Sequence, residues 1–260
     1  MKNINDESRY LWDSLAEDWD VRMGSGSNSF HREIIRPATL KLLNPQKGEH
    51  ILDAACGNGN FSRYLAGLGV RVTAFDYSAE MIRYARERSH DCAGCINYHI
   101  ADATKYDELM ALKGDTCFDK AVSNMAVMDI SNIRPLLKAV YDLLPDGGIF
   151  VFSGIHPCFQ TPNMRKITLV NDYSGKGEVL TGIQTFEYIE PKLHETYVLA
   201  NNDKKAYHFH RPLNVILKDC FAAGFVLDGV EEPVFQKPEQ IRGFDWYDIP
   251  PAIIVRLRKM

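Results

Sequence analysis

ILDAACGNGNFSRYL, residues 51–65, decides the fold. An apolar run reaches Asp53, a turn containing Gly57 and Gly59 follows, and a helical pattern begins near Asn60. Glycines at such a turn let the backbone approach a ligand and adopt conformations that a Cβ would obstruct. The turn alone is weak evidence, because many α/β proteins carry glycine after a strand. It also lacks the third glycine of the dinucleotide-binding pattern.

Short apolar or β-branched runs alternate with amphipathic stretches around this turn. The predicted strands are 50–55, 70–76, 96–102, 118–124 and 148–155, and the predicted helices are 61–68, 78–89, 103–113 and 131–144. A repeated strand–helix order predicts a parallel sheet with helices on both of its faces.

The flanking segments complete this core. Two N-terminal helices are predicted, one over 8–22 and one capped by Asn28 or Ser29 that continues to Leu43 with a kink at Pro37. After the core the helical period disappears, and 156–210 alternates in a strand-like way, for example over 166–173, 183–190 and 194–201. The helix 212–224 and the strands 225–232 and 252–259 then return to the core.

Composition and charge exclude several classes of protein. The 260 residues include 30 Lys and Arg against 34 Asp and Glu, a net charge of −4, which argues against general binding of nucleic acid phosphates. No apolar run is long enough to span a bilayer, and the first residues carry no secretory signal pattern. Six cysteines without such a signal indicate reduced thiols. We therefore expect a cytoplasmic protein without a membrane or nucleic acid partner.

Acidic residues end two further predicted strands. Asp76 ends the second strand, where its carboxylate can accept both hydroxyls of a ribose, and Asp102 ends the third, where it can accept from a purine amine. Met81, about one helical turn beyond Asp76, can pack against an aromatic ring. Each Asp could instead cap the next helix. Their succession at neighbouring strand ends favours a ligand site, because open parallel sheets bind ligands there.

Taken together, these motifs resemble those of the class I S-adenosylmethionine-dependent methyltransferases of small-molecule type. The matching stretches are ILDAACGNG (51–59), VTAFDYSAEMI (72–82), IADA (100–103), FDKAVSNMAVMDI (118–130) and LLPDGGIFVFS (143–153). The resemblance is dense over roughly 45–155. Ala55 departs from it, because the family has glycine there.

The resemblance implies a role for each matching residue toward S-adenosylmethionine. Asp53 orients the turn, and the backbone of Ala55, Cys56, Gly57 and Gly59 meets the methionine moiety. The remaining implied contacts are Asp76 with the ribose, Tyr77 and Met81 with the adenine faces, Asp102 and Ala103 with the adenine edge, and Asn124, Met125 and Ala126 beside the sulfonium.

A general base is needed only if the acceptor loses a proton during methyl transfer. His156 follows the fifth strand directly, and His208 and His210 share one face of a strand where the insert re-enters the core. We predict His156 as the base, with His210 as the second candidate. Arg211 could bind an acidic group of the substrate, and His31 could border the cofactor.

One rival site is a metal centre. Cys92 and Cys95 form a C-x-x-C pair flanked by His90 and His99, but no second cysteine pair completes it, so we expect no bound metal.

The predicted fold is therefore α/β: a Rossmann-like, seven-stranded, mostly parallel sheet with helices on both faces. Its segments are a helical lid (1–45), a cofactor-binding core (46–155), a β-rich substrate cap (156–211) and the C-terminal completion of the core (212–260). The expected function is methyl transfer from S-adenosylmethionine to a small-molecule acceptor. The alternatives are a non-catalytic S-adenosylmethionine-binding sensor or partner subunit and, less favoured, a nicotinamide-dependent dehydrogenase. Whether the chain assembles into a homodimer is left open by the sequence.

Overall fold

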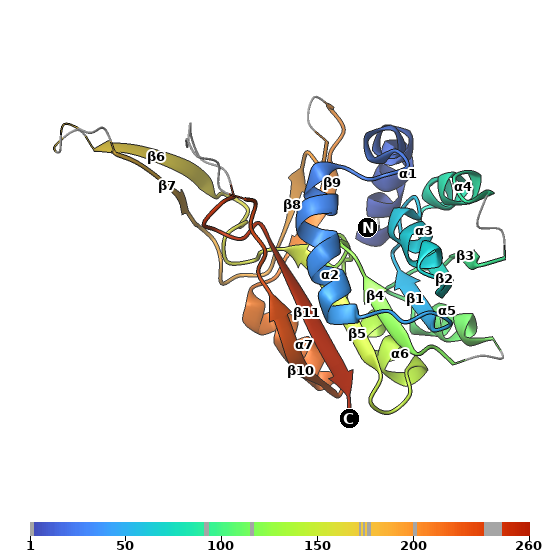
Figure 1. Cartoon of the computed structure of the whole chain (residues 1–260). Helices are drawn as coiled ribbons and strands as arrows, with labels where there is room; N and C mark the ends of the chain where they lie inside the picture. Colours follow the sequence, from blue (N-terminus) through green and yellow to red (C-terminus); the bar gives the residue numbers. More distant parts are fainter. Residues whose placement is uncertain are drawn as a thin grey trace.

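The computed structural model describes residues 3–90, 94–114, 117–171, 173, 175, 178–199, 202–236 and 246–260. Its centre is a seven-stranded sheet in the order β10-β11-β5-β4-β1-β2-β3 (Figure 1). The strands are β1 (His50–Ala54), β2 (Arg71–Asp76), β3 (Ile96–Ile100), β4 (Lys120–Ser123), β5 (Ile149–Ile155), β10 (Phe225–Glu231) and β11 (Ala252–Lys259). β1 to β5 pair in parallel, whereas β11 runs antiparallel to both of its neighbours, β5 and β10. The predicted fold class is confirmed.

Two hydrophobic layers cover the sheet because its strands are apolar on both faces. Along β1, Ile51 faces one layer and Leu52 the other, and Val151 and Phe152 divide β5 in the same way. One layer contains α2 (Arg36–Leu43), α3 (Asn60–Gly67) and α4 (Ala79–Glu87). The opposite layer contains α5 (Tyr106–Met110), α6 (Arg134–Leu143) and α7 (Leu213–Ala222).

The N-terminal segment forms two structures with different roles. α1 (Ile4–Met23) lies beside α4 and β9 at the edge of the molecule where β1 and β2 end (Figure 1). A π-helical turn (Phe30–Ile35) then leads into α2, so the predicted irregularity falls just before Pro37. Asn28 caps this helix, because its Oδ1 accepts a hydrogen bond of 2.9 Å from the His31 N–H. Of the predicted helical lid, α2 packs on the sheet, and α1 is the part called the lid below.

The insert consists of two separate hairpins. β6 (Arg165–Asn171) pairs with β7 (Glu178–Gln184), and this hairpin projects away from the sheet (Figure 1). β8 (Lys192–Thr196) pairs with β9 (Ala206–His210) beside α1. The predicted strand over 183–190 is wrong, because β7 ends at Gln184 and Glu187 has a left-handed φ of 51° that a strand does not accommodate.

None of the helices among the described residues has the length and hydropathy to cross a bilayer.

Candidate functional site

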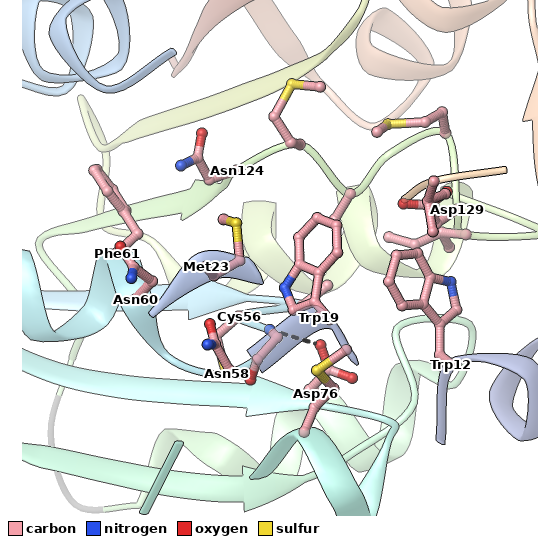
Figure 2. Close-up of a pocket in the computed structure, with 18 of the residues that line it drawn as sticks. Trp12, Trp19, Met23, Cys56, Asn58, Asn60, Phe61, Asp76, Asn124 and Asp129 are labelled. Atoms are coloured by element: carbon pink, nitrogen blue, oxygen red, sulfur yellow. Dashed lines mark hydrogen bonds between the residues drawn. The ribbon is translucent and has the colours of Figure 1, made fainter. Parts of the chain in front are cut away.

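A cavity of about 420 Å³ opens where the parallel strands end, under α1 (Figure 2). Of the residues predicted to hold a cofactor, all but Gly59 line it. They are Asp53, Ala55, Cys56, Gly57, Asp76, Tyr77, Met81, Asp102, Ala103, Asn124, Met125 and Ala126. The sheet brings them together because the carboxyl ends of β1, β2, β3 and β4 lie side by side at one edge.

The turn after β1 is tied to the end of β2. Gly57 adopts a left-handed φ of 54°, and its N–H donates a hydrogen bond of 2.9 Å to Asp76 Oδ2. A Cβ at Gly57 would lie 3.8 Å from Trp19 Nε1 of α1. The turn is therefore sandwiched between the sheet edge and the lid, with its backbone facing the cavity.

Gly59 has a packing role. Its φ is 70°, and a Cβ there would collide with the Tyr98 hydroxyl and lie 3.0 Å from Ala85 Cβ. Gly59 therefore lets α3 begin close against β3 and α4, and it does not line the cavity. The expected contact of its backbone with a cofactor does not follow from this position.

Two residues that the sequence assigns to the cofactor site share the left-handed φ of the glycines although they carry side chains. Ala55 has a φ of 54°, and Met125, the second residue after the end of β4, has a φ of 57°. The Met125 N–H is held by Ser153 Oγ at 2.8 Å, and the same hydroxyl donates to Asn124 Oδ1. Both strained residues line the cavity, as strained backbone often does at functional sites.

Asp53 and Asp76 are carboxylates buried beneath the turn. Burial raises the pKa of Asp53 to about 7 although Ser62 donates to its Oδ2, and burial raises the pKa of Asp76 to about 6 although two backbone N–H groups donate to it. Asp53 Oδ1 has no hydrogen-bond partner among the described residues. Such a cluster has capacity for a ligand that brings hydrogen-bond donors or positive charge.

The lid reaches the third acidic strand end. Asn5 of α1 donates from Nδ2 to Asp102 Oδ2 at 2.6 Å, while Thr104 occupies Oδ1 through its N–H and hydroxyl. Ser8 lies 3.0 Å from the Tyr77 hydroxyl. An amide from the lid thus occupies one oxygen of the carboxylate for which the sequence predicts a contact with a purine amine.

Aromatic and sulfur side chains complete the lid side of the cavity. Trp12 and Trp19 pack edge to face at 5.6 Å, and Met23 lies beside them (Figure 2). His31 also lines the cavity, and burial lowers its pKa to about 4, so this ring is neutral at physiological pH. His31 was expected beside the cofactor, whereas Trp12 and Trp19 fall within the predicted helix 8–22 and no role toward a ligand was expected for them.

The two predicted catalytic histidines do not line the cavity. Ile155, the last residue of β5, lines it, so His156 turns to the other side, where Nε2 lies 2.7 Å from Glu232 Oε1. His210 lies two residues after His208 on β9, and its Nε2 lies 2.7 Å from the Tyr188 carbonyl oxygen. The expectation that His156 or His210 faces the cavity is therefore corrected.

His208 is the histidine of the insert that lines the cavity. Its Nε2 lies 3.1 Å from Oδ1 of Asp129, which also lines the cavity. Asp129 stands within the fourth motif, but a single carboxylate in a loop gave no signal by itself. Arg211 does not line this cavity, and its guanidinium donates to the carbonyls of Val127, Ile130 and Ser131.

The structure describes only part of the rival metal site. Cys92 lies outside the described residues, and Cys95 is exposed. Within the described ranges no group of three His, Cys, Asp or Glu side chains has metal-binding geometry.

Comparisons with known proteins agree on one family. The family model described as a methyltransferase domain matches residues 51–148. A malonyl-[acyl-carrier protein] O-methyltransferase of Pectobacterium atrosepticum is 36% identical over 115 residues, which cover 44% of this chain and 42% of that protein. A ubiquinone biosynthesis O-methyltransferase of Coxiella burnetii is 30% identical over 162 residues, covering 61% and 66%. The chain thus spans less than two thirds of these curated relatives.

Solved structures extend the likeness beyond the core. The S-adenosylmethionine-dependent methyltransferase from Mesorhizobium loti superimposes with a TM-score of 0.64 and 25% identity. The superposition covers 86% of this chain and 96% of that protein.

Proposed function

We propose that this chain, which belongs to the class I S-adenosylmethionine-dependent methyltransferases, transfers a methyl group from S-adenosylmethionine to a small-molecule acceptor. The observation that carries the proposal is that residues of four family motifs, at the ends of β1 and β2 and directly after β3 and β4, line one cavity. S-adenosylmethionine, the cofactor of the family, supplies a methyl group already activated by a sulfonium sulfur.

The cavity residues fit this cofactor chemically. Three acidic strand ends suit its hydrogen-bond donors and positive charges, and the buried Asp53 Oδ1, without a partner among the described residues, has capacity for one of them. In our proposal Asp76 would hold the ribose hydroxyls, Asp102 would meet the adenine amine once Asn5 yields its place, and the residues after β4 would border the methyl group.

The chain's own contribution to the reaction would be positioning and exclusion of water. α1 covers the turn with Trp19, and the aromatic pair on α1 lines the cavity wall. Aromatic side chains on this wall would keep water away from the acceptor and help to order it for in-line attack. The two curated relatives named above are both O-methyltransferases, which favours an oxygen acceptor. A cytoplasmic location remains a prediction.

Formation of S-adenosylhomocysteine tests the proposal. The protein is incubated with S-adenosylmethionine and a metabolite extract, and the product is measured against a protein-free control. We expect product that depends on both protein and extract. Binding of S-adenosylmethionine without product would support the non-catalytic sensor or partner subunit, and binding of NAD in its place would support the dehydrogenase.

A further inference from the structure

The end of the cavity beyond the β4 loop contains a carboxylate–imidazole pair. Asp129 belongs to the core and follows β4, whereas His208 lies in the middle of β9 in the insert. His208 Nε2 lies 3.1 Å from Asp129 Oδ1, and the side chains are 12% and 13% exposed. Both residues line the cavity. This is the one place on its wall where the insert and the core bring two such groups together in the part of the chain that the structure describes.

The contact between Asp129 and His208 leaves hydrogen-bonding capacity of the carboxylate unused. Oδ1 of Asp129 is buried and, despite the proximity of His208, has no partner in hydrogen-bond geometry among the described residues. Burial raises the pKa of Asp129, and His208 opposes that shift. An incompletely bonded buried carboxylate destabilises a fold, so its presence on a cavity wall points to a ligand that completes it.

The backbone holds the pair in place from both sides. The Phe209 N–H donates to the Met128 carbonyl at 2.7 Å, which joins β9 to the loop that carries Asp129. The hairpin β8–β9 is in turn tied to α1, where Lys204 Nζ donates to the Ser14 carbonyl and pairs with Asp18. The position of His208 over the cavity therefore depends on the lid and hairpin together.

The surroundings indicate what kind of molecule would meet the pair. Trp12 lines the same cavity as Asp129 (Figure 2), and so do Tyr197 and Met128. Rings and a thioether offer flat apolar contact. The pair itself offers an acceptor for a proton. A small aromatic molecule with a hydroxyl group matches both features.

We propose that His208 and Asp129 form an acid–base pair that takes the proton of a hydroxyl group on a small aromatic acceptor, with His208 as the base and Asp129 as its positioning carboxylate. The inference rests on the proposed methyl transfer. The oxygen electron pair forms the new O–CH₃ bond while the S–CH₃ bond breaks, its electrons returning sulfur to a neutral thioether. The hydroxyl proton passes to the His208 ring, whose positive charge Asp129 balances.

A binding experiment tests the acceptor class without turnover. The ring signals of ¹⁵N-histidine-labelled protein loaded with S-adenosylhomocysteine are followed by NMR during titration with phenol, and with toluene, which lacks the hydroxyl. The His208 signal is assigned from His208→Gln. We expect a saturable shift of the His208 signal with phenol alone. Equal shifts with both compounds, or none with phenol, would overturn the proposed acceptor class.

Variants test the role of the base. In the extract assay, His208→Gln is expected to lower the rate of product formation by roughly 10²–10⁴-fold while the affinity for S-adenosylhomocysteine stays unchanged. Asp129→Asn should lower the same rate. Imidazole added to His208→Ala should restore part of it, which a purely structural role would not explain.

His194→Gln provides the matched control. His194 pairs with His208 across the hairpin, and the centroids of the two rings are 5.7 Å apart. His194 does not line the cavity under α1. It should retain the rate. An equal loss in both variants, or an unchanged rate in His208→Gln, would contradict the inference. Wild-type protein that binds the cofactor but forms no product would instead contradict the proposed function.

Discussion

Ala55 has the left-handed conformation that an alanine adopts at a cost. Its φ is 54°, at the position where the family pattern has glycine. We expect Ala55→Gly to raise the free energy of unfolding by about 1 kcal/mol, because the Cβ strain outweighs the extra entropy of glycine in the unfolded chain. Denaturant unfolding measures the change. Ala54→Gly, at the end of β1, is the control and should lower the stability; stabilisation of both variants would refute the strain.

Asp53 makes the stability of the protein depend on pH. Because burial raises its pKa to about 7, the folded chain keeps the Asp53 proton over a range, from about 4 to 7, in which the unfolded chain has lost it. The contribution of this group is therefore complete at low pH and is lost as the pH rises through 7. The same sign holds for Asp76, whose pKa is raised to about 6.

Asp53→Asn should remove much of this dependence. We expect the free energy of unfolding of the variant, relative to that of the wild type, to rise by roughly 2–4 kcal/mol between pH 4 and pH 8, since each unit of pKa shift corresponds to about 1.4 kcal/mol. Ser62 can still donate to the amide oxygen, so shape and hydrogen bond are retained. Denaturant unfolding of both proteins at pH 4 and pH 8 measures this difference, and the comparison at pH 4 serves as the internal control. A difference independent of pH would show that Asp53 is ionised throughout.

At the scale of elements, Gly59 controls the approach of α3 to β3. We expect Gly59→Ala to lower the free energy of unfolding by about 3 kcal/mol, because the new methyl group meets Tyr98 and the φ of 70° is strained. A double-mutant cycle with Tyr98→Phe measures the steric part. Removing the hydroxyl should recover some of the loss. Strict additivity of the two changes would mean that only backbone strain acts.

The cavity residues at the strand ends could be predicted from sequence, whereas the histidine of the insert that lines the cavity could not. Asp76 and Asp102 followed from the pattern because parallel strands align their carboxyl ends whatever the details of packing. The expected place of His156 at the cavity differs from the structure by a single residue, because Ile155 at the end of β5 lines the cavity and alternation sends the next side chain to the other side. A sequence pattern locates the end of a strand with an uncertainty larger than one residue.

At the scale of the whole molecule, the lid joins segments that no local pattern connects. Asn5 and Asp102 are 97 positions apart, and Lys204 reaches Ser14 across 190. Helical periodicity identified α1 as amphipathic but carried no information about where its apolar side would pack. Only the folded chain shows that α1 and the hairpin β8–β9 together form one wall of the cavity, whereas β6–β7 extends away from it (Figure 1).

The binding of S-adenosylmethionine, titrated calorimetrically against wild type and Asp76→Ala, tests the central claim most directly. We predict one site per chain in the wild type, no binding of NAD, and an affinity about 5- to 150-fold lower in the variant, since the ribose would lose a buried acceptor worth roughly 1–3 kcal/mol. Unfolding of both proteins without ligand controls for stability. Equal affinities would remove Asp76 from the site, and no binding to the wild type would contradict the account as a whole.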